Sequence, residues 1–330
     1  MAIKNDEYWT QRIADEQKWQ KQNLANDAKL NDKLEQHYTN ALQSIQDSID
    51  NDISRLASRD YVTRESALKA VSQNDIKQFE SKAKQIVDES RTLYKAKGMP
   101  MEYEDWSAEV NARLRLYNAT MRIDKAEYLK SKIGLEMTQA GMRVDANLQS
   151  NLSDAYQAEV KRQAGILSES YSAPNAKQVM KAVMATSNGA TYSTKLWANQ
   201  DTLKAKIDDV VSRGIIQGKN PKTIARQFRS ELKNTVVNSR YVTERLARSE
   251  MARVQDMAQM DSFKKYGYDF CKWIAEPSAC NYCKAFAQQQ GGVYKVSEAP
   301  SVPAHANCRC SKSAWYKPSK ISNQPKHSTK

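Results

Sequence analysis

The stretch that decides the fold is Leu30–Leu56, which reads LNDKLEQHYTNALQSIQDSIDNDISRL. Apolar side chains recur in it at steps of three or four residues, at Leu30, Leu34, Tyr38, Leu42, Ile45, Ile49, Ile53 and Leu56. This spacing places them along one side of an α-helix. Helix breakers are scarce around it, since Pro100 is the only proline before Pro174. The sequence therefore predicts long helices in the first half of the chain.

Helical patterns continue on both sides of Pro174. Gly134 and Gly141 weaken the third helix without requiring a break, and Asn220 is expected to cap a helix that begins at Pro221. The predicted helices cover about 30–56, 75–97, 105–142, 143–170, 176–185, 192–213, 221–235 and 236–266.

The pattern changes after residue 266. Tyr268–Ile274 is short and aromatic-rich, which predicts a strand, and Gly291-Gly292 before Val-Tyr-Lys-Val predicts a hairpin. The last twenty residues hold five lysines and no acidic residue, as in a mobile basic tail. We therefore expect a mainly α-helical, elongated protein with a small α+β zinc-stabilised C-terminal module. Its predicted parts are a long-helix region (1–173), a basic helical middle domain (174–266), a Cys/His module (267–315) and a flexible basic tail (316–330).

The charge of the chain is unevenly distributed. The net charge is +13, and mean hydropathy is −0.77, which suits long exposed helices. Residues 1–201 carry 28 basic and 28 acidic side chains, so the remaining 23 basic and 10 acidic side chains account for the whole excess. This asymmetry indicates either a polyanionic partner or a solvated basic surface.

The amino-terminal sequence and the hydropathy pattern indicate whether the chain has a membrane anchor and whether its cysteines are expected to form disulfides. The sequence has no apolar run near the ~18–20 residues that span a bilayer. Its first residues also lack the apolar segment of a secretory signal. We therefore expect no membrane anchor, and synthesis in a reducing cytoplasm, where disulfides are disfavoured.

Four of the five cysteines and one of the three histidines lie between Ser278 and Cys310. They form a C-x-x-C pair and an H-x-x-C-x-C group. Zinc takes four thiolate or imidazole ligands in a tetrahedron, and two such groups can supply them. The expected ligands of one structural zinc per chain are Cys280, Cys283, His305 and Cys308, with Cys310 as the alternative fourth ligand. A metal would stabilise a module too small to build a sufficient core.

Other interpretations of this cluster are weaker, although cysteines that are merely buried and reduced remain an alternative. A surplus of ligands favours a closed site over a catalytic zinc with an open position. A redox pair would need an alternating β/α pattern, and a zinc deaminase would need H-x-E. Phosphate-binding loops and serine-hydrolase motifs are absent from the sequence. It therefore predicts no catalytic residue, no cofactor other than zinc and no enzymatic activity, and Cys271 is expected to be a buried strand residue.

Basic side chains in the last third of the chain are candidates for contact with double-stranded DNA. Backbone contacts of this kind are salt-dependent and insensitive to sequence. The alternative is pairing with acidic neighbours such as Glu244 and Glu250. The candidates are Arg226, Arg229, Arg240, Arg245, Arg248, Arg309, Lys312, Lys317 and Lys320.

Four stretches resemble the tailed-phage minor head proteins, or head morphogenesis proteins, of the Mu F type. They are EYWTQR (7–12), KLWANQDTLKAKIDDVVSRGIIQGKNPKTIARQF (195–228), RLARSEMARVQ (245–255) and the pattern W-x-A…C-x-x-C…G-x-x-Y…P-x-H-x-N-C-R-C (273–310). The resemblance covers most of 190–310 and is thinner before it. Ala306 stands where the family often has proline, which leaves the candidate ligands unaffected.

This resemblance implies a virion protein present in few copies, located in the capsid interior near the portal after assembly in the host cytoplasm. Such proteins act in head morphogenesis, DNA packaging or genome ejection, and their partners are the portal protein, the major capsid protein, or both. Two alternatives are a metal-dependent nuclease or hydrolase that uses the Cys/His cluster, and a free nucleic-acid-binding regulator.

Overall fold

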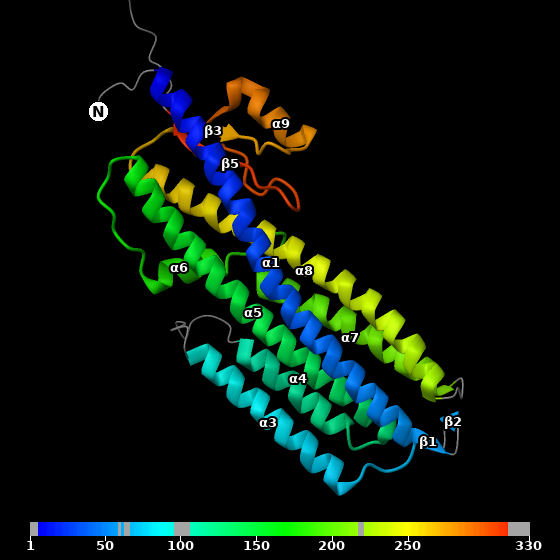
Figure 1. Ribbon diagram of the computed structural model, residues 1–330. Coiled ribbons are helices and arrows are strands. Elements are labelled where there is room, and N and C mark those ends of the chain that lie inside the picture. Colours follow the sequence, from blue (N-terminus) through cyan, green and yellow to red (C-terminus); the bar gives the residue numbers. More distant parts are fainter. Residues whose placement is uncertain (1–5, 59–60, 63–66, 96–105, 217–220, 316–330) are drawn as a thin grey trace, which may run out of the picture.

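The computed structural model is an elongated bundle of long helices with a small sheet at one end (Figure 1). It describes residues 6–58, 61–62, 67–95, 106–216 and 221–315. The helices are α1 (Asp6–Leu56), α3 (Gln73–Lys95), α4 (Trp106–Thr120), α5 (Lys125–Ile166), α6 (Ala176–Val183), α7 (Tyr192–Ile216), α8 (Pro221–Lys265) and α9 (Asn281–Gln288), and the 3-10 turn η1 spans Gln289–Gly292. Two short strands, β1 (Ala57–Ser58) and β2 (Tyr61–Val62), pair after α1. The expectation of a mainly helical protein is confirmed.

The main core lies between α1, α5, α7 and α8. The apolar stripe of α1 enters it as predicted, since Leu34, Ile45 and Ile49 are almost fully buried. α5 and α8 run along α1 over most of its length, so three helices of 42 to 51 residues share one interface. These helices are polar on average, and burial of their apolar faces along this interface is what stabilises them.

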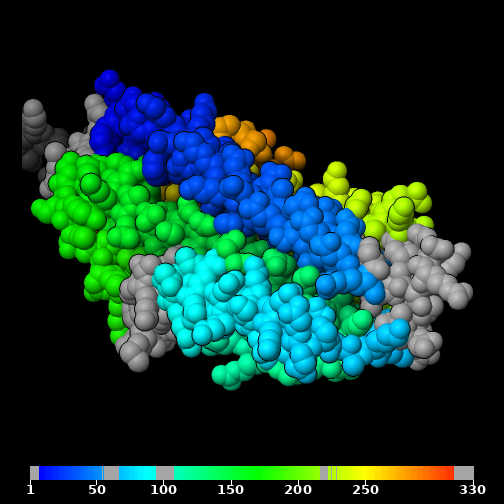
Figure 2. Space-filling view, turned by 60° about the horizontal axis from the view of Figure 1, so that its bottom comes forward, coloured from blue at the N-terminus to red at the C-terminus, as the bar shows by residue number. Residues whose placement is uncertain are grey.

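A second layer, made of α3 and α4, covers the outer side of α5. Figure 2 shows α1 and α3 together forming much of one face of the molecule. The close packing explains both glycines inside α5. A Cβ on Gly134 would lie 2.6 Å from the ring of Tyr117, and one on Gly141 would lie 3.0 Å from the ring of Trp197. These positions admit a neighbouring aromatic ring and do not interrupt the helix.

Several helix boundaries differ from those predicted, and α1 begins at Asp6, well before Leu30. The third helix breaks at 121–124, where Asp124 has extended backbone and accepts a hydrogen bond from the Glu127 N–H at 2.9 Å. With this cap α5 begins as a new helix, and it continues without a break past residue 143, where a separate helix was expected to begin. The two helices predicted over 221–266 are the single helix α8. Gly98, Gly218 and Asn220 lie outside the described residues.

The carboxy-terminal sheet has the strand order β4-β3-β5, with β3 (Phe270–Ile274) antiparallel to both neighbours. β3 is the predicted strand. The hairpin prediction is wrong, because β4 (Val293–Lys295) pairs with β3 across the intervening α9. The interpretation of the last twenty residues as a mobile tail is wrong for Ser311–Trp315, since these residues form β5, which pairs along all of β3. Residues 316–330 lie outside the described part of the chain.

Packing is continuous across the expected division at residue 173. The main core joins side chains of α1 and α5 to those of α6, α7 and α8. The sheet and α9 have two small clusters of their own, which meet the bundle at Ala252 and Phe263 of α8. The division into a long-helix region and a middle domain stays a prediction about how the chain is organised.

Candidate metal centre and basic surface

The predicted ligands come together between α9 and the loop before β5. Cys280 is the N-cap residue of α9, and Cys283 lies in its first turn. α9 is held on β3 by Phe286, whose ring centroid lies 5.0 Å from that of Trp273. His305 lies in the long loop that joins β4 to β5. The sheet therefore fixes the distance between the two ligand-bearing segments.

Three separations between ligand atoms are close to those found around a small soft cation. Nε2 of His305 lies 3.1 Å from Sγ of Cys280 and 3.2 Å from Sγ of Cys283, and the Sγ atoms of Cys283 and Cys308 are 3.7 Å apart. A tetrahedral zinc with bonds of ~2.3 Å to sulfur and ~2.0 Å to nitrogen separates its sulfur atoms by ~3.8 Å, and sulfur from nitrogen by ~3.5 Å. The ligand atoms form two groups, Cys280–Cys283–His305 and Cys283–Cys308–Cys310, which share Cys283.

His305 presents the correct nitrogen to the cysteines. Its Nδ1 lies 2.8 Å from the carbonyl oxygen of Ala306, so Nδ1 carries the ring proton and donates a hydrogen bond to that oxygen. This hydrogen bond raises the pKa of His305. In the neutral ring the lone pair of Nε2 then faces Cys280 and Cys283. A histidine oriented through its second nitrogen is typical of a metal ligand.

The thiols differ in their tendency to ionise. A hydrogen bond from the Cys310 thiol lowers the pKa of Cys308 to about 5 and raises the pKa of Cys310. Burial raises the pKa of Cys283 to about 12, whereas a backbone N–H of Cys283 lowers that of exposed Cys280. The Sγ atom of Cys308 lies 3.7 Å from that of Cys283, which is a suitable separation for a fourth ligand, and Cys310 belongs to the same group and stays the alternative. Cys271 is buried in β3, as expected of a strand residue.

The segment that carries this cluster also matches a known family. Residues 205–313 match the sequence model of the family described as Phage Mu protein F like protein. The resemblance to Mu F-type head morphogenesis proteins is thus confirmed. Comparison with curated proteins gave no match, and comparison with solved structures gave none.

The Mu F-like segment runs from α7 to β5 and covers about a third of the chain. The family is one of structural head proteins, and it indicates a virion location for this protein. Among the described helices, none combines the length and the apolar character needed to cross a bilayer.

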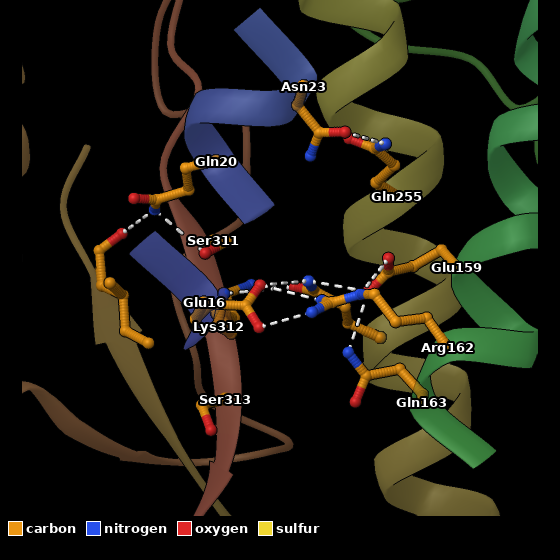
Figure 3. Close-up of polar contacts among 12 residues, drawn as sticks. Glu16, Gln20, Asn23, Glu159, Arg162, Gln163, Gln255, Ser311, Lys312 and Ser313 are labelled. Atoms are coloured by element: carbon orange, nitrogen blue, oxygen red, sulfur yellow. Dashed lines mark hydrogen bonds and ion pairs between the residues drawn. The ribbon is translucent and has the colours of Figure 1, made fainter. Parts of the chain in front are cut away.

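The end of the Mu F-like segment is joined to the bundle by a buried polar seam (Figure 3). Arg309 donates to both carboxylate oxygens of Asp27 in α1, at 2.8 and 2.5 Å. The Nζ of Lys312 lies 2.8 Å from the Asp256 carboxylate of α8. Arg309 and Lys312 are 3% and 1% exposed, so a duplex cannot reach them. Their assignment as DNA contacts is corrected to a role in docking β5.

The sequence did not predict that polar side chains of α1 are buried in this seam. Arg12, Glu16, Gln20, Asn23 and Asp27 are all buried, and their spacing of three and four residues continues into the apolar stripe that starts at Leu30. Polar side chains at this spacing look like a solvated helix face. Only the partners reveal their burial, as where the Gln20 amide donates to the backbone of Ile274 at 2.8 Å.

Glu16 and Glu159 form the centre of the seam around one guanidinium. Arg162 of α5 donates to both carboxylates at 2.7 to 2.9 Å, and both carboxylates are fully buried. The Gln259 amide of α8 donates to the same two side chains, at 3.2 and 3.0 Å. α1, α5 and α8 therefore meet at one charged contact.

The remaining predicted DNA contacts lie along α8. Arg226 and Arg245 are exposed and make no ion pair with any residue that the structure describes. Arg229 is exposed and pairs with Asp50 of α1, whereas Arg240 and Arg248 are half-buried. Arg240 pairs with Glu35 and Glu244, and Arg248 with Glu276. Lys317 and Lys320 lie outside the described residues.

Two lysines extend the pattern begun by Arg226 and Arg229. Lys222 and Lys233 are exposed on the same side of α8, and steps of four, three and four residues join the four cations. We call Lys222, Arg226, Arg229 and Lys233 the basic stripe. Helical spacing of the charges in the sequence could have identified it. The stripe lies at the end of the bundle that is far from the sheet (Figure 1).

Proposed function

We propose that this protein is a minor head protein of a tailed phage that lies near the portal in the capsid interior and contacts packaged DNA. In this role it takes part in head morphogenesis, DNA packaging or genome ejection. The family match supports the head-protein role. The basic stripe is the observation that carries the DNA contact, because it lies within the Mu F-like segment and is exposed.

The dimensions of the basic stripe suit a nucleic-acid backbone. Lys222 and Lys233 are eleven residues apart, which corresponds to ~16 Å along a helix, or about five base pairs of a duplex. A straight helix side with four cations can follow phosphates, but it offers no groove-reading motif. Binding should therefore be weakened by salt and indifferent to sequence.

The stripe is tested by the double variant Arg226→Ala/Lys233→Ala, since neither side chain has an ion pair among the described residues. We expect it to weaken binding to a 30-base-pair duplex and to reduce the slope of log K against log salt by about two. The control is Lys161→Ala/Lys264→Ala, which removes the same charge from exposed positions outside the stripe. Equal losses in both variants would show that only the net charge matters.

The same protein–DNA measurement separates this function from a sequence-specific regulator. The proposal predicts equal affinity for duplexes of unrelated sequence at one salt concentration. A difference of a hundredfold or more between them would instead support a regulator, since specific sites are typically bound at least ~10³ times more tightly.

We also propose that the Cys/His cluster binds one structural zinc, through Cys280, Cys283, His305 and Cys308. The contacts that His305 and Cys308 each make with Cys283, and the orientation of His305, support this set, and binding of one ion would draw together the two groups that share Cys283. Zinc would link α9 to the loop before β5 and so replace core that this small module lacks. Its ligands would fill the tetrahedron, which leaves no open position for a nuclease or hydrolase.

Elemental analysis of protein purified without chelator should find about one zinc per chain. Cys283→Ser should lose the metal, because Cys283 belongs to both ligand groups, whereas the control Cys271→Ser should retain it. Absence of metal, with the cluster thiols all freely reactive in the folded protein, would refute the site.

The partner on the protein side is proposed to be the portal or major capsid protein, bound by the neutral helical half. Two large apolar side chains near the carboxyl end of α4 support a contact there, since Leu116 is 60% and Ile123 is 65% exposed. Co-purification with the portal protein of the same genome tests this contact. Leu116→Ser/Ile123→Ser should abolish co-purification, and an unchanged yield would place the contact elsewhere.

A further inference from the structure

A groove of about 840 Å³ lies beside the metal cluster. One wall is α8, the second is the turn at 185–188 before α7, and the third is the loop at 301–306 that carries His305. Its volume falls within the ~300–1,000 Å³ of sites that enclose a ligand. Val242, Leu246 and Met257 supply apolar surface to it.

The loop that forms the third wall is fixed at several points. The Val302 N–H donates to the buried carboxylate of Asp256 at 3.1 Å, and the Asn307 N–H donates to Oγ of Ser249 in α8 at 3.1 Å. His305 adds the contact with the cysteine cluster. The groove is therefore bounded by ordered backbone, and its shape is preformed.

The groove carries excess positive charge. Lys195 and Arg253 share one carboxylate, that of Glu250, with Nζ of Lys195 at 3.1 Å and Nε of Arg253 at 2.5 Å. Arg253 is held in place, because its guanidinium also donates to the carbonyl oxygens of Ala182 and Val183. Arg245 is exposed on the lining and makes no ion pair with a described residue.

We infer that this groove binds an extended, acidic segment of a partner protein. Arg245 and Lys195 would receive its carboxylates, because charge-assisted bonds from a guanidinium or an ammonium are the strong interactions available here. Val242 and Leu246 would contact the apolar side chains that alternate with those carboxylates in an extended chain.

Double-stranded DNA fits this groove less well. A duplex is convex and rigid, so its phosphates cannot reach Arg253, which lines the groove and is almost fully buried. This inference stands apart from the proposed DNA contact, because the basic stripe lies outside the groove. Arg245, which the sequence offers as a DNA contact, is thereby assigned to a peptide ligand.

The test uses the full chain and a fluorescein-labelled octapeptide of alternating glutamate and leucine, followed by fluorescence anisotropy. We expect saturable binding, and binding at least tenfold weaker for the peptide with glutamine in place of glutamate. Arg245→Ala should weaken binding about tenfold, whereas the control Arg226→Ala, an exposed arginine of the same helix outside the groove, should leave it unchanged.

Three results would overturn the inference. One is equal binding of the glutamine peptide, and another is equal loss in Arg245→Ala and Arg226→Ala. The third is displacement of the peptide by a duplex whose own affinity falls tenfold in Arg245→Ala, which would assign the groove to nucleic acid. If Arg226→Ala/Lys233→Ala left DNA binding unchanged, these outcomes for the peptide would not be affected. The proposed DNA contact and the proposed peptide groove can therefore be refuted independently.

Discussion

The ion pair between Arg309 and Asp27 should decide whether the sheet stays on the bundle. Both residues are buried, at 3% and 5% exposure, and two hydrogen bonds join them. Arg309→Met leaves the Asp27 carboxylate buried without its cation, which should lower the free energy of unfolding by ~3–5 kcal/mol. In Asp27→Leu/Arg309→Met neither charge remains, so the loss should be at least ~2 kcal/mol smaller than the sum of the two single losses.

Urea unfolding followed by tryptophan fluorescence measures this cycle. Trp315 of β5 packs on Trp9 of α1 with ring centroids 4.6 Å apart, so its emission reports on docking. The control is Arg213→Met. Arg213 pairs with Asp209 and Glu231 at the surface, where its side chain is 54% exposed, so this substitution should lower the free energy of unfolding by under ~1 kcal/mol. If the losses at Arg309 and Asp27 simply add in the double variant, the buried-pair reasoning is refuted.

Two further predictions concern α5. Gly134→Ala should destabilise the protein by ~1–3 kcal/mol, because the new methyl group meets the Tyr117 ring, whereas Gly165→Ala, with open space around it, should be neutral or stabilising in thermal unfolding. Burial raises the pKa of Glu159, but the Arg162 charge outweighs it, so the pKa lies below 4.5. The stability that this carboxylate contributes is present above pH 4.5 and is lost as pH falls through its lowered pKa. Glu159→Gln should therefore flatten the fall in unfolding free energy below pH 4.5, and an unchanged pH profile would contradict this.

The helices could be predicted because their signal is local. The apolar steps of α1 and the aromatic run of β3 each report a backbone preference within a few residues. The Cys/His cluster was predictable for a similar reason, since metal ligands are few in kind and closely spaced. The helix break at Asp124 was not predicted, because the capping aspartate lies within a sequence of otherwise helical character.

The polar seam could not be predicted, because its meaning depends on partners that are distant in sequence. Asp27 and Arg309 are 282 positions apart, and each looks like an ordinary surface charge. β5 has the same difficulty, since SKSAW becomes a strand only when β3 offers an edge.

The sequence by itself determined the long helices, the position of the first strand of the sheet, the candidate metal ligands and the excess of positive charge after residue 201. These follow from periodicity, residue chemistry and charge, which neighbouring residues express without a fold. Only the tertiary structure decided which of those charges face solvent. It buries Arg309 and Lys312 against carboxylates of α1 and α8, and leaves Arg226, Lys233 and Arg245 exposed, because a charge is accommodated inside a protein only where folding brings it an opposite charge.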